Sequence, residues 1–187
     1  MNKKLVVYFS HKGENYSKGR IVTLEKGNTE IAAEIISTIT GADIFEIEAD
    51  EKYPIKYDDC IEIAKKELRE NSRPKLKDDI DIKEYDTIFV GYPNWWGTMP
   101  MPVWTFLEEK DFTNKKVLPF CTHEGSGLGK SESDIKKLTG GSEVLKGLAI
   151  NGSEVNNSEK QIKKWLEDSL NDNKRSEWTI RIDTRYT

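Results

Sequence analysis

The sequence predicts an α/β protein built on a three-layer, doubly wound parallel sheet. Apolar runs of strand length alternate with longer amphipathic segments along most of the chain, which is typical of consecutive βαβ units. Five such runs and five such segments occur, and their strict alternation requires right-handed crossovers with helices on both faces of the sheet. The 29 basic and 33 acidic residues are mixed along the 187-residue chain, which disfavours global disorder.

Each predicted strand is a short apolar run between residues that end regular structure. The first run combines Leu, Val and aromatic residues and stops at Ser10. The third is continuously apolar, which suits the middle of a parallel sheet covered on both faces. The five predicted strands span residues 4–9, 44–47, 87–91, 117–121 and 143–150.

The predicted helices have apolar residues every three to four positions. In the first, Ile31, Ala32 and Ile35 begin this spacing and Gly41 ends the helix. The third begins with Pro102, whose missing N–H costs nothing in a first helical turn. The five predicted helices span residues 28–40, 58–71, 102–109, 131–138 and 158–170.

Composition and charge exclude several classes of protein. The net charge of −4 lacks the basic surplus of a nucleic-acid binder, and the apolar runs are far shorter than a membrane span. No signal peptide precedes the first strand, so we expect a cytoplasmic protein. Cys60 and Cys121 have neither CxxC spacing nor a nearby histidine at the spacing of a metal-ligand motif, so we expect buried free thiols and no metal site.

The chain is expected to form one domain over residues 1–170 with a C-terminal extension over residues 171–187. In the extension Trp178, Ile180 and Ile182 alternate with polar residues, which is a strand pattern. This segment could add an edge strand, cover part of the surface or pair with a second subunit.

In doubly wound sheets ligands bind outside the carboxyl ends of the strands. The loops after the first, third and fourth strands, residues 10–29, 92–100 and 122–130, are therefore the candidate site. The first contains Ser10 and ends in Gly27, Asn28 and Thr29 at the start of a helix, where free N–H groups and hydroxyls can hold a phosphate. An ordinary helix cap explains the same residues.

The second loop is aromatic. Side chains on an extended segment alternate in direction, so Trp95 and Trp96 cannot both point into one core. Together with Tyr92, and with Pro93 and Gly97 fixing the backbone, they form a wall for a planar ring, or they pack the loops against each other.

The third loop is rich in glycine. Gly129-Lys130-Ser131 follows a strand as in a Walker A motif, but Glu124 stands where that motif needs glycine. Lys130 likewise breaks the GxGxxG dinucleotide pattern. What remains is a loop able to bring N–H groups to a ligand, with His123 and Glu124 as polar groups, or a mobile turn with no ligand.

Taken together, these motifs make the chain resemble the flavodoxin-like superfamily, and within it the bacterial flavodoxin-family proteins with a long insertion in the first loop. The resemblance covers roughly residues 3–170, and the Tyr-Pro-Asn-Trp-Trp motif at 92–96 is its most specific part. It implies a strand order of 2-1-3-4-5 and non-covalently bound FMN. The insertion over residues 11–26 interrupts the usual short phosphate loop, and Tyr16 or Lys18 from it could fold over the cofactor.

The resemblance also implies which residues contact FMN. The phosphate would lie at Ser10, Asn28 and Thr29. The isoalloxazine ring would lie between two loops, contacting Pro93, Asn94, Trp95, Trp96 and Gly97 on one side and Thr122, His123, Glu124, Gly125, Ser126 and Gly127 on the other. A Glu124 charge near the ring would lower its reduction potential, whereas a protonated His123 would raise it.

The function implied by the resemblance is electron transfer as an FMN carrier, with a redox partner protein or a small acceptor such as a quinone. An FMN-dependent NAD(P)H:quinone-type oxidoreductase is the first alternative. The second is a flavin-free domain that binds a phosphate ester or a protein at the helix N-terminus near Asn28. A monomer and a homodimer are both compatible with the sequence.

Overall fold

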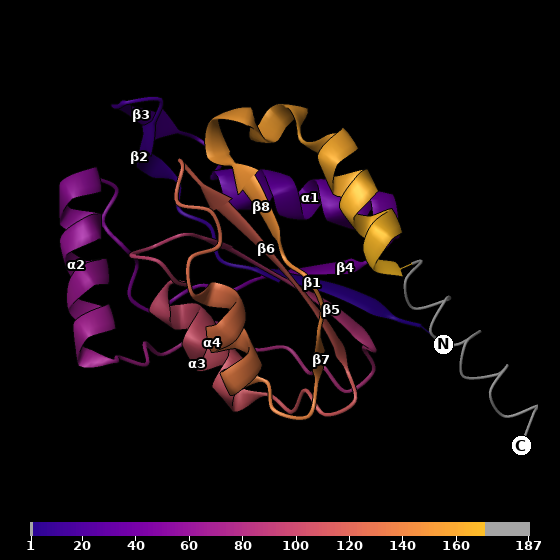
Figure 1. Ribbon diagram of the computed structural model, residues 1–187. Coiled ribbons are helices and arrows are strands. Elements are labelled where there is room, and N and C mark those ends of the chain that lie inside the picture. Colours follow the sequence, from indigo (N-terminus) through magenta and orange to yellow (C-terminus); the bar gives the residue numbers. More distant parts are fainter. Residues whose placement is uncertain (1, 171–187) are drawn as a thin grey trace, which may run out of the picture.

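The computed structural model describes residues 2–170 and confirms the predicted α/β class with a parallel central sheet. In Figure 1, α1 and the last helix lie on one face of this sheet, and α3 and α4 lie on the other. The main-sheet strands are β1 (Lys4–Tyr8), β4 (Asp43–Glu46), β5 (Thr87–Pro93), β6 (Lys116–His123), β7 (Glu143–Val144) and β8 (Leu148–Asn151). The helices are α1 (Asn28–Thr40), α2 (Tyr57–Glu70), α3 (Met101–Glu109), α4 (Ser131–Leu138), the 3-10 helix η1 (Gly152–Asn157) and a helix over residues 159–170.

The strand order is β4-β1-β5-β6-β7, with β8 also paired to β6. This is the predicted order, but the predicted fifth strand over residues 143–150 is wrong as one continuous element. Its break faces Pro119, which has no N–H to donate. The Leu145 N–H donates to the Val117 carbonyl, so the backbone polar groups of Val117 point toward the fifth strand. Alternate residues of a strand point their backbone polar groups to the same side, so the backbone of Pro119 also points toward the fifth strand. Pairing resumes where Phe120 is opposite Leu148.

The long insertion in the first loop is a β-hairpin of β2 (Gly13–Ser17) and β3 (Arg20–Leu24). Its turn residues Lys18 and Gly19 both have positive φ, 49° and 83°, as a two-residue type I′ turn requires. The sequence analysis described residues 11–26 only as an insertion and did not identify the hairpin. The hairpin forms a separate two-stranded sheet beside the main one.

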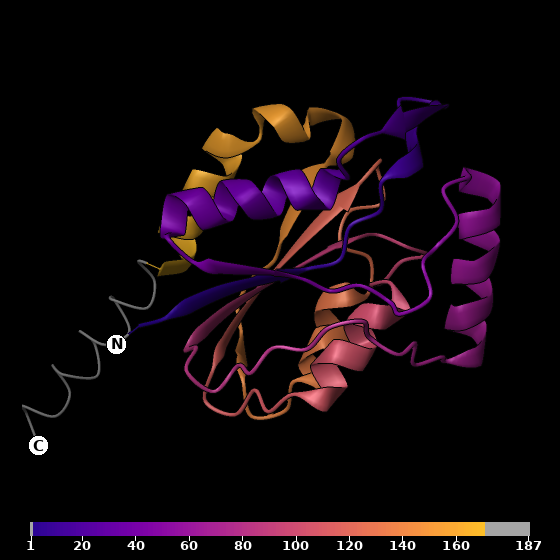
Figure 2. The ribbon, with the colours of Figure 1, turned by 180° about the vertical axis from the view of Figure 1, so that it is seen from behind.

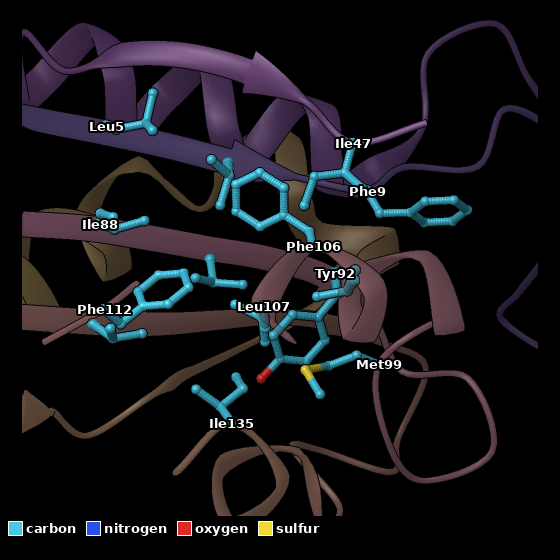
Figure 3. Packing of buried hydrophobic residues seen from close by; sticks show 14 of the residues in the cluster. Leu5, Phe9, Ile47, Ile88, Tyr92, Met99, Phe106, Leu107, Phe112 and Ile135 are labelled. Carbon is cyan, nitrogen blue, oxygen red and sulfur yellow. The ribbon is translucent and has the colours of Figure 1, made fainter. Parts of the chain in front are cut away.

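Each face of the sheet is covered by one apolar core. Figure 3 shows Phe106 and Leu107 of α3 packed over strand residues including Ile88. On the opposite face, Gly91 in β5 leaves room for a ring, because a Cβ there would lie 2.1 Å from Phe120 Cζ. These packed strands hold the carboxyl ends of β1, β5 and β6 in fixed positions.

One helix departs from the predicted three-layer arrangement. Figures 1 and 2 show α2 standing beside the sheet near the hairpin, away from both helix layers. Only Cys60 and Ala64 of α2 are buried, and within the described residues neither apolar core includes an α2 side chain. The predicted three-layer arrangement is confirmed for the other helices, and α2 lies outside both helix layers. The C-terminal strand predicted from Trp178 lies outside the described residues.

Candidate functional site

A cavity of about 420 Å³ lies between the carboxyl ends of the sheet strands, the hairpin and α2. This is the edge of the sheet at which the sequence places the site. Of the fourteen residues predicted for the site, three do not line the cavity and eleven do. The eleven are Asn28, Thr29, Pro93, Asn94, Trp95, Trp96, Gly97, Thr122, His123, Glu124 and Ser126.

The other three predicted residues, Ser10, Gly125 and Gly127, support the loops that form the cavity. Ser10 Oγ accepts a hydrogen bond from the Glu30 N–H (3.1 Å), which caps the first turn of α1 in place of a side chain at Gly27. The Gly127 carbonyl accepts from Asn94 Nδ2 (2.8 Å). A direct hydrogen bond therefore holds the aromatic loop after β5 against the glycine-rich loop after β6.

The N-terminus of α1 forms one end of the cavity. Gly27 approaches Ser10 so closely that a Cβ on Gly27 would lie 2.1 Å from Ser10 Oγ. The first-turn N–H groups of a helix have no partners inside the helix, and here Asn28 and Thr29 present this turn to the cavity. This end of the cavity can hold an anion such as a phosphate.

The two tryptophans of the aromatic loop have different surroundings. Trp95 packs edge-on against Phe9 and Tyr53, with ring centroids 5.2 and 5.1 Å apart. Trp96 is 49% exposed, and its Nε1–H donates to the Ile61 carbonyl of α2 (3.3 Å). The alternation of direction that the sequence predicts is therefore present, and Trp96 is the tryptophan that joins the loop to α2.

Trp96 also has a rare backbone conformation. Its φ is +56°, and the next residue, Gly97, has a φ of +84°. Positive φ is unfavourable for a bulky residue and is kept only where the surroundings enforce it. Here the Gly97 N–H donates to Asn94 Oδ1 (2.9 Å) and the Lys130 N–H donates to the Gly97 carbonyl (2.7 Å). The turn that presents Trp96 is thus fixed from both sides.

His123 is held as a neutral ring. Partial burial lowers its pKa below the usual value, an effect that the neighbouring Glu124 partly opposes. The Gly125 N–H donates to His123 Nδ1 (2.9 Å), so Nδ1 carries no proton. The protonated His123 considered from the sequence, which would raise a flavin potential, is disfavoured in this structure.

Glu124 lies near the α1 end of the cavity. Its Oε2 accepts from the Lys18 N–H at the hairpin turn (3.4 Å), whereas its Oε1 is buried and has no partner. A Cβ built on Gly152 would lie 2.8 Å from this oxygen and 2.6 Å from Asn28 Nδ2. The carboxylate therefore lies close to the first turn of α1, and its predicted contact with the ring stays a prediction.

Two further segments supply cavity residues, of which the sequence analysis named only Tyr16. The insertion contributes His11, which precedes the hairpin, and Glu14, Asn15 and Tyr16 of β2. Helix α2 contributes Tyr57, Cys60, Ile61 and Ala64, and Gly152 completes the lining. Tyr16 was expected to fold over a cofactor, but Lys18 does not line the cavity and pairs instead with Glu154 (3.2 Å). The α2 residues were detectable as the apolar face of a predicted helix, but the sequence analysis did not connect that face with the site.

Both cysteines are buried free thiols, as the sequence predicts. Burial raises the pKa of the Cys60 thiol to about 12 and that of Cys121 to about 12. Cys60 lines the cavity as a small, neutral, apolar side chain. It is not activated as a nucleophile.

Residues 2–170 contain no helix long and apolar enough to cross a membrane. Within the same residues, no group of three or more His, Cys, Asp or Glu side chains is arranged to hold a metal ion.

The fold and the cavity define a doubly wound α/β protein with a candidate ligand site at the carboxyl ends of its strands. A family model described as Flavodoxin matches residues 3–169, and the chain belongs to this family. The resemblance stated from the sequence motifs is thereby confirmed. No curated protein matches the sequence.

Solved structures from bacteria are similar to this chain along most of its length. A protein from Bacteroides eggerthii described as a flavoprotein has 28% identity and a TM-score of 0.72, covering 91% of this chain and 99% of its own. A second from Bacteroides uniformis has 29% identity and a TM-score of 0.70, covering 89% and 98%. A Lactobacillus acidophilus flavoprotein in complex with FMN has 25% identity and a TM-score of 0.60, covering 84% and 98%.

Proposed function

We propose that the chain binds FMN non-covalently in this cavity and transfers electrons through the flavin ring. One observation carries the proposal. A helix N-terminus and an aromatic wall face the same cavity at the carboxyl ends of the strands, in a chain of the Flavodoxin family. A helix N-terminus suits a phosphate, and an aromatic wall suits a planar ring. The FMN complex of the Lactobacillus acidophilus relative supports the choice of flavin.

The residues present fit the parts of FMN. Asn28 and Thr29 would hold the phosphate, and Trp96 with the inner face of α2 would contact the ring. When bound, FMN would supply one- and two-electron chemistry. The protein would orient it, exclude water and keep a neutral His123 nearby.

We propose a carrier role, because the sequence contains no second recognisable nucleotide motif. The partner would be a redox protein or a small acceptor such as a quinone. Two free thiols support a reducing, cytoplasmic setting. An FMN-dependent NAD(P)H:quinone-type oxidoreductase is the alternative. Consumption of NAD(P)H with a quinone, dependent on added FMN, would establish the reductase and overturn the carrier role.

Titration of the purified protein with FMN tests the binding proposal. We expect quenching of tryptophan emission at micromolar FMN and a visible flavin spectrum that stays with the protein during gel filtration. Trp96→Ala should weaken binding. The matched control is Trp104→Phe, since Trp104 lies on α3 beneath Arg73 and does not line the cavity.

Absence of both quenching and retained flavin would overturn the proposal. A flavin-free protein that binds a phosphate ester at α1 would then be favoured. That protein should keep its phosphate-ester affinity when Trp95 and Trp96 are both replaced by alanine.

A further inference from the structure

Helix α2 has a side that faces solvent and carries an exposed apolar residue. Figures 1 and 2 show α2 at the edge of the molecule, and only its Cys60 and Ala64 side chains are buried. Isolated helices shorter than about 12–15 residues are marginal in water, so a helix with so little burial gains from a further contact. Ile63 points roughly 100° around the helix from Ala64. Its side chain is 40% exposed.

Charged residues lie along α2 on both sides of Ile63. Asp59 lies four residues before Ile63 and Lys66 three residues after it, a spacing that puts the three side chains on one side of the helix. Lys56 at the N-cap and Glu70 at the last position of α2 lie seven residues from Ile63 in either direction. These five residues are called the α2 stripe below. Its four charged residues are exposed, and none of them forms an ion pair within the part of the chain that the structure describes.

The charges of the α2 stripe are complementary to the same stripe running in the opposite direction. When two copies of α2 lie antiparallel with their Ile63 side chains in contact, Asp59 faces Lys66 of the partner subunit. Lys56 likewise faces Glu70 of the partner subunit. An isologous interface uses the same residues on both subunits, so its two-fold axis repeats each of these ion pairs. The result is an apolar centre with matched charges at both ends.

Other partners match the α2 stripe less well. In a parallel pair, Asp59 would face Asp59 of the partner subunit and Lys66 would face Lys66 of the partner subunit, and like charges repel. A partner of a single charge sign would match only the acidic or only the basic members of the stripe. The alternation of signs therefore favours a second copy of this chain. One helix pair gives a small interface, so we expect a dimer that dissociates on dilution.

We infer that the chain forms a homodimer through the α2 stripe, with antiparallel helices and Ile63 at the centre. The inference goes beyond the proposed function and needs no bound flavin. Cys60 and Ala64 on the inner side of α2 line the cavity, whereas the stripe lies on a side that faces solvent. The dimer would give this helix a packed neighbour outside the cavity.

Sedimentation equilibrium of the full chain over a roughly 100-fold range of concentration tests the inference, because mass action favours the monomer on dilution. The wild type should be dimeric at the high end and monomeric at the low end. Asp59→Lys replaces two attractive pairs with two repulsive ones, so it should raise the dimer dissociation constant by about 10- to 30-fold. Lys66→Asp should have the same effect.

An equal mixture of these two variants is the sharpest test. In a heterodimer of Asp59→Lys with Lys66→Asp, each reversed charge faces an opposite charge again. The mixture should therefore associate about as tightly as the wild type, although each variant alone does so weakly. A variant that had failed to fold could not be rescued in this way.

The matched control is Asp58→Lys. Asp58 is exposed and undergoes the same change of charge, but its side chain points roughly 100° around the helix from Asp59, on the side away from Ile63. Its dissociation constant should equal that of the wild type. Circular dichroism would check that each variant is folded.

Several results would overturn the inference. A wild type that stays monomeric at every concentration would show that the stripe holds no second copy. A dimer that Asp59→Lys leaves intact would place the interface on another face. Equal weakening by Asp58→Lys would mean that only net charge matters, and a mixture that does not associate would contradict the pairing of Asp59 with Lys66 of the partner subunit.

Discussion

The hydroxyl oxygens of Thr29 and Thr122 lie 2.8 Å apart in a buried hydrogen bond that joins the first turn of α1 to the carboxyl end of β6. Both residues line the cavity. The bond therefore fixes the distance between the anion-binding end of the site and the loop that carries His123 and Glu124.

Replacing Thr122 with valine keeps the side-chain shape and leaves the Thr29 hydroxyl buried without its partner. We expect a loss of about 1–3 kcal/mol in the free energy of unfolding, the usual effect of an unsatisfied buried polar group. Urea denaturation would measure it. Thr122→Ser retains the hydroxyl and should recover most of the loss, and equal stability of the valine variant and the wild type would contradict the role of this bond.

The two tryptophans should separate stability from ligand binding. Trp95→Ala removes the ring that packs against Phe9 and Tyr53, so we expect clear destabilisation, below the roughly 3–5 kcal/mol typical of a fully buried tryptophan because Trp95 is only partly buried. Trp96→Ala should change stability little and weaken FMN binding. Thermal unfolding without ligand and an FMN titration would check this, and the reverse pattern would refute the assignment.

His123 gives a pH dependence with a defined sign. Its pKa in the folded protein lies below the ordinary value of 6.5, so between these two values the unfolded chain binds more protons than the folded one. Folding stability contributed by this residue should therefore fall as the pH decreases below about 6.5. Unfolding free energies of the wild type and His123→Asn, measured at intervals of about one pH unit between roughly pH 8 and pH 5, would show this loss of stability.

Asparagine is the suitable comparison at position 123, because its Oδ1 can still accept from the Gly125 N–H while carrying no proton that titrates. The difference in stability between wild type and variant should shrink or reverse toward acid. A constant difference over this pH range would argue against the lowered pKa.

The hairpin should be dispensable for folding and needed for ligand retention. Gly13 is paired with Leu24, so residues 14–23 can be replaced by a short Gly-Ser linker without separating the ends. None of the hairpin residues belongs to either apolar core within the described part of the chain. We expect a folded protein from which FMN dissociates faster than from the wild type, measured by the return of flavin fluorescence on dilution. An unchanged dissociation rate would remove the hairpin from the site.

Much of this architecture could be predicted because local patterns and tertiary packing agree. The predicted strands and helices differ from the observed ones by at most two residues at each end, apart from the strand broken opposite Pro119. That break depends on which side of β6 the proline nitrogen faces, and strand composition does not reveal it. The hairpin turn was also hidden, since its first residue is Lys18 and not the Asn or Asp that usually signals a type I′ turn.

The site was predicted best where loops follow strands and least well where helix packing decides. The residues after β5 and β6 reach the cavity because parallel strands deliver their ends to one edge. The apolar face of α2, with Tyr57, Ile61 and Ala64, has the same periodicity as a helix packed on a sheet. A sequence pattern shows that a face is covered, but it does not show what covers it.

The position of α2 has a consequence for how the molecule would be completed. A doubly wound protein normally closes its core with helices on both faces, yet the inner face of α2 meets a cavity where a sheet face would be expected. A bound flavin would then fill the space next to α2, so that the helix packs against a cofactor instead of against the sheet. Such a helix would exchange its amide hydrogens faster than α1 when the ligand is removed, and the ligand would count as a structural member of the fold.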